Sequence, residues 1–156
     1  MTVEAKGEFT PVDPGFEARV RASFARQAVM GSFGAQLAQV EPGAVAIAWP
    51  FRADLTQQHG FLHAGILATM LDSACGYAAY SLMPADAAVL AVEFKINLLA
   101  PAQGERFVAR ARVIRAGRTL TVCEADAFAI QDQGEKRIAH MVGTIMCVRD
   151  NPTLAG

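Results

Sequence analysis

Asp72 is the residue whose surroundings most clearly require a chemical explanation. It is the only charged residue in HAGILATMLDSACGYAAYSLM, an apolar run that spans residues 63–83. Removing an isolated carboxylate from water is costly, so such an acid must be paired, exposed at an interface or protonated. Carboxylates in such places are common in catalytic sites, and a structural hydrogen bond at a subunit contact is the alternative. The run supplies no compensating cation, which favours a site that is open to a ligand.

The segment before this run has the features of an anion-binding site. It reads QQHGFLHAG from Gln57 to Gly65, and its glycines let the backbone pass close to a ligand. The first amides of a helix lack internal partners and carry partial positive charge, which suits the oxyanion of an attacked carbonyl. Asp72 follows Ala64 by eight residues, a little over two helical turns. A bound acyl group could therefore lie between Asp72 and an opposing surface, for which a second subunit is one source.

Other site chemistries fit the sequence less well. His59 and His63 are four residues apart, but there is no HExxH motif and Gly60 disfavours a helix through both, so we expect no metal site. No GxSxG motif occurs, and Ser73 has no obvious histidine partner. Cys75 lies in the apolar run, where burial makes a thiol inert. Neither GxGxxG nor GxxxxGK[ST] is present, so any nucleotide phosphate would be held by side chains.

The composition indicates one domain that associates with itself. A chain of 156 residues can form a single core, and its net charge of −1 argues against a nucleic-acid partner. Charged residues are 19% and hydrophobic residues 53%, which predicts surface hidden between subunits. The three scattered cysteines indicate free thiols in a reducing cytosol. The N-terminus, MTVEAKGEFTPVDPGF, lacks the basic start and apolar run of a signal peptide, so we expect a cytoplasmic protein.

Hydrophobic periodicity predicts helices and strands in a definite order. We expect a loose arm over residues 1–12, then a helix from Pro14 to about Met30 with Asp13 as its cap. The run at residues 63–83 is long enough to cross a bilayer, but the central Asp72 and the strands around it argue against a membrane helix. The expected strands cover residues 35–40, 44–51, 87–99, 107–113, 119–130 and 136–148, the last four forming a meander with short turns.

These elements predict an α+β fold. A helix that is apolar on nearly all sides must be buried on nearly all sides, and a long antiparallel sheet needs a cover for one face. Wrapping the sheet around the helix satisfies both needs. We therefore divide the chain into an N-terminal arm and helix, residues 1–33, and one domain, residues 34–150.

The stretch LHAGILATMLDSACGYAA resembles the helix signature of the PaaI-like branch of the 4-hydroxybenzoyl-CoA thioesterase superfamily, an HGG motif followed by a catalytic acid. FKINLLAPAQGE and IRAGRTLTVCEADAF are similar to the strand, turn and hairpin that follow in that family. The resemblance covers about residues 41–148. It implies a hotdog fold, in which a curved antiparallel sheet wraps a long central helix, and hydrolysis of an acyl-CoA thioester.

The resemblance also implies a role for each matching residue. Asp72 falls on the carboxylate that acts as nucleophile or as general base for water. Ala64 falls on the glycine whose backbone amide polarises the thioester carbonyl, and Gly65 on the glycine after it. Gln57 falls on a residue that contacts the thioester or the water, and we expect it to come from the facing subunit. His63 is expected to fix the loop through hydrogen bonds.

Arg115 and Arg118 flank Gly117 at a turn where relatives often hold the phosphates of coenzyme A; two solvated turn charges are the alternative. Coenzyme A is then part of the substrate, and no separate cofactor is expected. The chain departs from the family by Ala64 in place of glycine. It also has Ala91 and Gly76 at positions where some relatives carry a Ser or Thr that positions the water.

The resulting expectation is a thioesterase for an aryl- or medium-chain acyl-CoA. It is expected to form a homodimer, within a dimer of dimers. Two alternatives stay open: a hotdog protein that binds acyl-CoA without cleaving it, and a hotdog hydratase. The first would be indicated by a ligand that co-purifies intact. The second would need a catalytic histidine paired with an acid, for which His63 is poorly placed.

Overall fold

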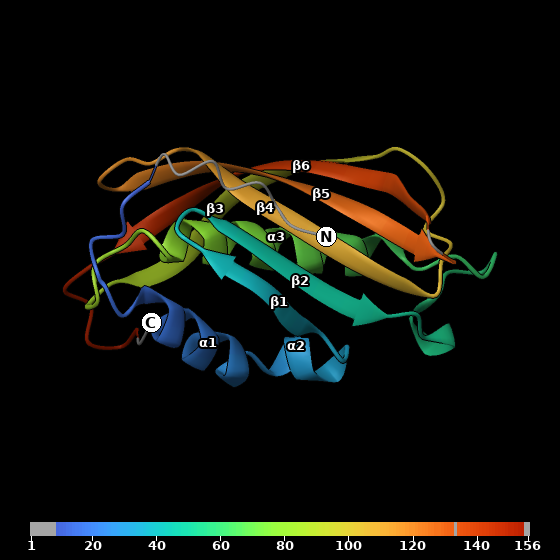
Figure 1. Cartoon of the computed structure of the whole chain (residues 1–156), viewed down its shortest axis with the longest axis horizontal. Coiled ribbons are helices and arrows are strands. Elements are labelled where there is room, and N and C mark those ends of the chain that lie inside the picture. The colour runs from blue at the N-terminus through green and yellow to red at the C-terminus, as the bar shows by residue number, and fades with distance from the viewer. Residues whose placement is uncertain (1–8, 133, 155–156) are drawn as a thin grey trace.

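One long helix lies against one curved antiparallel sheet in the computed structural model, which describes residues 9–132 and 134–154 (Figure 1). The helix, α3, spans Ala64–Tyr80. The sheet has six strands, and the prediction of an α+β fold is confirmed. The strands are β1 (Gln36–Glu41), β2 (Ala44–Pro50), β3 (Ala88–Leu98), β4 (Arg106–Arg115), β5 (Leu120–Gln131) and β6 (Gly134–Val148).

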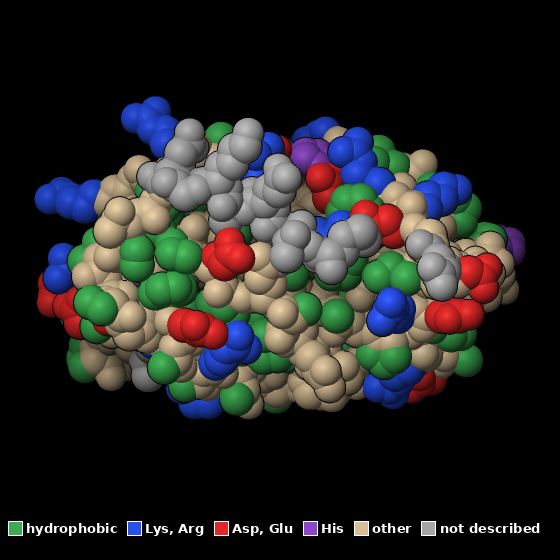
Figure 2. All heavy atoms as spheres, in the orientation of Figure 1, with side chains coloured by type: hydrophobic (Ala, Val, Ile, Leu, Met, Phe, Trp, Pro, Cys, Tyr) green, Lys and Arg blue, Asp and Glu red, His purple; other side chains and the backbone are tan. Residues whose placement is uncertain are grey.

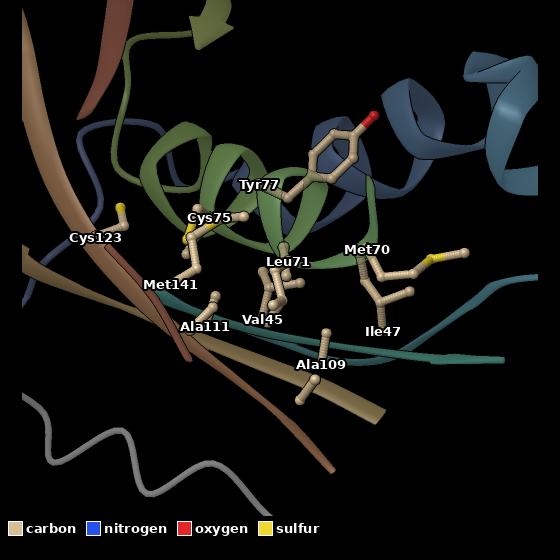
Figure 3. Close-up of a cluster of buried hydrophobic side chains, with 14 of the residues drawn as sticks. Val45, Ile47, Met70, Leu71, Cys75, Tyr77, Ala109, Ala111, Cys123 and Met141 are labelled. Carbon is tan, nitrogen blue, oxygen red and sulfur yellow. The ribbon is translucent and has the colours of Figure 1, made fainter. Parts of the chain in front are cut away.

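The core forms between α3 and the concave face of the sheet. Strands β4 and β5 alternate buried and more exposed residues along most of their length, as expected when one face of a sheet is covered. Leu71 and Cys75 of α3 point toward the sheet, whereas Tyr77 points to the opposite side (Figure 3). The sheet side chains that meet α3 include Val45, Ile47, Ala109, Ala111, Cys123 and Met141.

The strand order differs from the predicted four-strand meander. The order is β1-β2-β4-β5-β6-β3, so β4, β5 and β6 are successive neighbours but β3 pairs with β6 at the far edge. The segment between β3 and β4 is not a hairpin turn, because its Ala102 carbonyl accepts a hydrogen bond from the Leu62 amide at 3.0 Å. The chain therefore passes the beginning of α3 before it enters β4. Within residues 9–132 and 134–154, one edge of β3 therefore has no neighbouring strand.

The predicted N-terminal helix is two helices, α1 (Phe16–Arg26) and α2 (Ala28–Ser32). They are separated at Gln27, whose backbone is extended with φ −77° and ψ 96° and whose side-chain amide donates to Ser73 Oγ at 3.4 Å. Asp13 is not the cap residue, which is Gly15, but its carboxylate accepts from the Gly15 amide at 2.8 Å. Residues 1–8 of the predicted arm lie outside the described residues.

Helix α1 covers one side of α3. Arg19 donates to the carbonyl of Met83 at 2.8 Å and lies over the ring of Tyr80, 4.2 Å from its centroid. Phe24 packs against Tyr77 with ring centroids 5.7 Å apart. In the part of the chain that the structure describes, no helix is both long and apolar enough to cross a membrane.

Candidate functional site

The loop from Gln57 to Leu62 holds the start of α3 in place. The Gln57 amide donates to the Phe61 carbonyl at 2.8 Å, and Gly60, with φ 83°, closes the turn through a bond to the Gln57 carbonyl at 3.0 Å. A left-handed φ of this kind favours glycine. The amides of Leu62 and His63 bond to neighbouring segments, so the loop is fixed at both ends.

His63 caps α3. Its backbone is extended, and its Nδ1 accepts a hydrogen bond from the Gly65 amide at 2.8 Å. The Ile66 amide donates to the His63 carbonyl at 3.0 Å. The expectation that His63 fixes this segment through hydrogen bonds is therefore met by a specific contact.

Replacing His63 should test this cap directly. His63→Ala removes the acceptor of the Gly65 amide, and we expect it to lower the free energy of unfolding by about 1 kcal/mol. His63→Asn restores a short side chain that caps helices well, so its stability should lie close to that of the wild type. Chemical denaturation of the three proteins measures the difference. Equal losses of stability in both variants would show that the hydrogen bond from the Gly65 amide to the side chain at position 63 does not stabilise the protein.

Capping leaves one amide at the beginning of α3 unused. Ala64 is the first helical residue, and its N–H makes no hydrogen bond within residues 9–132 and 134–154. Ala64 lines a cavity of about 450 Å³ together with Gln57, Phe61, Leu62, Leu67 and residues 98–102. An unpaired amide at the positive end of a helix, beside an apolar cavity, can stabilise a developing oxyanion.

Gln57 lies in the same cavity as Ala64. Its side-chain carbonyl accepts a hydrogen bond from the His59 amide, so this oxygen is committed to the turn. The side-chain NH2 group makes no hydrogen bond in the described part of the chain and can donate to a ligand. Gln57 and Ala64 therefore belong to one chain at one cavity. The expectation that Gln57 comes from the subunit facing Asp72 stays a prediction.

Asp72 lies on a stripe of α3 that the described residues leave partly exposed. We name Gly65, Thr69, Asp72 and Gly76 the open stripe; none of them is buried, and spacings of three and four residues put them on one helix face. The Asp72 carboxylate has no hydrogen-bond or ion-pair partner among the residues that the structure describes. Partial burial raises the pKa of Asp72 above its ordinary value. The carboxylate is thus accessible, unpaired and more basic than an ordinary aspartate.

Within one chain, Asp72 does not reach the Ala64 cavity. Asp72 is absent from the residues that line it, and eight residues of helix separate the two positions by about 12 Å. Thr69, which the sequence analysis did not single out, lies on the open stripe between them, and its hydroxyl donates to the Gly65 carbonyl at 2.9 Å. Its spacing of three residues from Asp72 is the sequence signal that could have identified it.

The predicted phosphate-binding turn lies at the other end of α3. Gly117 and Arg118 line a second cavity, of about 170 Å³, with Ala79 and Met83. Arg115 pairs with Val122 in the strand register, on the outer side of the sheet. The structure therefore does not bring these three residues to the Ala64 cavity of the same chain.

The side chains of Ser73 and Cys75 have no surroundings that would make them nucleophiles. Ser73 is 7% exposed and faces Gln27. Cys75 is buried, and that burial holds the pKa of its thiol well above the ordinary range. Among the described residues, no three His, Cys, Asp or Glu side chains gather where they could hold a metal ion.

Comparison with known proteins agrees with this architecture. A solved thioesterase family protein from Silicibacter pomeroyi is 56% identical, with a TM-score of 0.86, over 86% of this chain and 99% of that one. The E. coli PaaI protein from the phenylacetic acid degradation operon shares the fold, with a TM-score of 0.77 at 21% identity over 85% of this chain and 93% of that one. These structures confirm the predicted hotdog fold.

Sequence comparison gives the family. A Saccharolobus solfataricus protein that is provisionally named an esterase is 29% identical over 80% of this chain and 81% of its own length. The model of the thioesterase superfamily, 4HBT, matches residues 59–136, which run from the loop before α3 into β6. The chain therefore belongs to the thioesterase superfamily.

Proposed function

We propose that this protein hydrolyses the thioester of an acyl-CoA and releases a free acid and coenzyme A. Membership of the thioesterase superfamily supports thioester cleavage as the general activity. The observation that carries the proposal is Asp72: a partly buried carboxylate with a raised pKa and no partner among the described residues. Such a group is poised to act as a base or a nucleophile at neutral pH.

The proposed site takes its two halves from two chains. The Ala64 amide and the Gln57 side chain of one chain would hold the carbonyl oxygen, and Asp72 of the second chain would act on the carbonyl carbon. Position 68 lies midway between 64 and 72 along α3. A two-fold axis near Ala68 would therefore bring Asp72 of each chain level with Ala64 of the other, if the two helices run antiparallel.

The uncovered edge of β3 supports such a dimer. Phe94 and Leu98 are 43% and 55% exposed although their register partners Gly143 and Ala139 are buried on the inner face. An edge strand with exposed apolar side chains is a template for pairing with another chain. Antiparallel pairing of two β3 edges runs the two α3 helices in opposite directions, which is the arrangement the proposed site requires.

The reaction can then be written for one site. Asp72 either takes a proton from water, whose oxygen adds to the thioester carbon, or adds to that carbon itself. The carbonyl oxygen becomes an oxyanion that accepts from the Ala64 amide, with Gln57 as a second donor. The C–S bond breaks as the carbonyl reforms, and coenzyme A leaves as a thiolate, which needs no strong general acid. In the second route, water then cleaves the mixed anhydride on Asp72.

The apolar lining of the Ala64 cavity supports an aryl or medium-chain acyl group. The residues that line it include Phe61, Leu62, Leu67, Leu98 and Leu99. Release of free thiol from a panel of acyl-CoA esters tests this choice, and the highest kcat/KM should fall on aryl or medium-chain members. No thiol release from any member, with acyl-CoA still bound, would instead identify a binding protein.

Arg118 and Gly117 are the proposed contacts for the phosphates of coenzyme A. In the antiparallel dimer, the C-terminal end of one α3, next to Arg118, lies on the same side as the N-terminal end of the other α3, where Ala64 is. Arg118→Ala should therefore raise KM for an acyl-CoA by about tenfold, the loss of one charged hydrogen bond, and leave kcat nearly unchanged. A pantetheine thioester without the nucleotide serves as the control substrate. An equal effect on both substrates would contradict a phosphate contact.

A further inference from the structure

Thr69 is the second polar side chain of the open stripe, after Asp72. The other two members of the stripe, Gly65 and Gly76, have no side chain. Thr69 precedes Asp72 by three residues, which places their Cβ atoms about 5–6 Å apart on one helix face. Side chains of a helix tilt toward its N-terminus, so the Asp72 carboxylate leans over the turn that carries Thr69. The two side chains therefore face the same space above α3.

The hydroxyl of Thr69 is available to a ligand as a hydrogen-bond acceptor. It donates its single proton to the Gly65 carbonyl at 2.9 Å, and this bond fixes the direction of the side chain. A hydroxyl oxygen also accepts hydrogen bonds through its lone pairs. In the described part of the chain, no group donates a hydrogen bond to the Thr69 hydroxyl. An O–H group of a bound molecule would therefore complete its hydrogen bonding.

Asp72 is an acceptor without the kind of partner that other carboxylates of the chain have. Glu135 pairs with Arg110 at 2.8 Å, and Asp13 pairs with Arg19 at 2.9 Å. Acidic and basic side chains also lie next to one another on the face seen in Figure 2. The open stripe has no basic side chain, so a hydrogen-bond donor from a bound molecule is the partner that the Asp72 carboxylate requires.

One water molecule can satisfy both acceptors at once. Hydrogen bonds of about 2.8 Å from its two O–H groups reach oxygen atoms about 4.5–5 Å apart. The spacing of Thr69 and Asp72 on the helix allows this separation of their oxygens. A water bonded to Asp72 alone could rotate about that bond. A second bond to Thr69 fixes the direction in which the lone pair of the water points.

The hydrogen-bond donors of the proposed site lie on its opposite side. The Ala64 amide and the side-chain NH2 group of Gln57, from the second chain, suit the carbonyl oxygen of the thioester. Asp72 and Thr69 suit the two O–H groups of a water. Among the described residues, a Cβ added at Gly76 would meet no atom of another segment within 4 Å. The side of Asp72 away from Thr69 therefore has room for the leaving group.

We propose that Thr69 is a catalytic residue whose hydroxyl holds the attacking water against Asp72, which acts as the general base. One O–H bond of the water breaks and its proton passes to Asp72, while the other O–H group stays bonded to Thr69 Oγ1. The water oxygen adds to the thioester carbon. The C–S bond then breaks, its electron pair leaves with the sulfur, and the thiolate takes up a proton from Asp72 or from solvent. This inference rests on the proposed function and selects direct attack by water as its route.

Competition between water and methanol tests this role, because methanol has one O–H group and water has two. Methanol can give its proton to Asp72 without a second acceptor. Thr69→Val keeps the shape of the side chain but removes the hydroxyl. It should lower kcat for hydrolysis about tenfold, leave KM unchanged and leave the rate of methyl ester formation nearly unchanged. Acid and methyl ester are measured in one reaction mixture, with benzoyl-CoA or octanoyl-CoA, whichever the wild type cleaves faster. The ester-to-acid ratio should rise about tenfold.

Two further variants separate the proposed role from support of the helix. Thr69→Ser keeps the hydroxyl, so its kcat and its ester-to-acid ratio should stay within about threefold of the wild type. Ser32→Ala is the matched control, because the Ser32 hydroxyl also donates to the carbonyl four residues earlier, that of Ala28, at 3.1 Å. This variant should match the wild type in both kcat and ratio.

The ester-to-acid ratio decides between the two roles of the hydroxyl. An unchanged ratio in Thr69→Val would show that the hydroxyl supports the helix alone, and would overturn the proposal whatever the loss in kcat. A wild-type kcat in Thr69→Val, or no methyl ester from this variant, would also overturn it. None of these results affects the proposed function. That function fails if the wild type releases no thiol from any acyl-CoA, or if Asp72→Asn stays fully active.

Discussion

Replacing Asp72 with asparagine should lower kcat for acyl-CoA hydrolysis by about 10²–10⁴-fold, the usual contribution of a positioned acid–base group. Asparagine has nearly the same shape but can neither accept a proton from water nor form an acyl intermediate. KM should change little, because Asp72 acts on the reacting carbon and does not hold coenzyme A. Thiol release at saturating substrate measures the loss. Unchanged kcat would remove Asp72 from the mechanism.

The same variant should be more stable than the wild type at neutral pH. Burial raises the pKa of Asp72, so between the pKa of unfolded aspartate, about 3.9, and the raised value the folded state binds more protons than the unfolded state. Stability therefore falls as pH rises through this window, and Asp72→Asn removes that loss. The gain in stability of Asp72→Asn should vanish at pH values below the pKa of unfolded aspartate. In the wild type, kcat should decline as pH falls through the raised pKa.

Asp150→Asn is the matched control for these measurements. Asp150 is exposed and has a left-handed φ of 57°, which asparagine tolerates well. The kcat of Asp150→Asn and the pH dependence of its stability should both match those of the wild type. If Asp72→Asn were less stable than the wild type at neutral pH, the carboxylate would have a structural partner, contrary to its assigned role.

Replacing Ala64 with proline should lower kcat by about 10²–10³-fold, the cost of losing one oxyanion donor. Proline removes the backbone N–H and nothing else from the proposed site. The substitution suits this position, because Ala64 is the first residue of α3, where proline is favoured. His63 before it has φ −62° and ψ 139°, which is the conformation that a following proline requires. The fold should therefore be retained.

Ala53→Pro is the matched control for the proline. Ala53 begins the short 3-10 helix Ala53–Leu55 and also follows a residue with an extended backbone, Arg52. This variant should keep wild-type kcat and a wild-type circular dichroism spectrum. If Ala64→Pro were folded and fully active, the carbonyl oxygen would have to be held by another donor, and the role of the α3 start would be wrong.

The fold could be predicted from sequence because its strongest signals are local. The apolar run around Asp72 predicts a largely buried helix, and the alternation of Val92, Phe94, Ile96 and Leu98 predicts a strand. The place of β3 beside β6 could not be predicted this way. Strand order depends on where the chain passes after Leu98, and the bond from Leu62 to Ala102 that fixes this path joins residues far apart in sequence.

The residues of the candidate site could be singled out from the sequence, but their arrangement could not. A carboxylate in an apolar helix and glycines before that helix are visible in the sequence, as is the resemblance that assigns Asp72 and Ala64. That Asp72 lies outside the cavity lined by Ala64 of the same chain could be learned only from the structure. The break at Gln27 was also hidden, because it depends on a contact with Ser73, 46 residues away.

The most direct test of the two-chain site mixes two inactive chains. Asp72→Asn and Ala64→Pro chains, each with its own affinity tag, are co-expressed and the mixed dimer is purified through both tags. One site of that dimer then combines an intact Asp72 with an intact Ala64, so activity should return to about half of the wild-type value per dimer. Activity no higher than that of the two parent variants would show that both residues act from the same chain and would contradict the account.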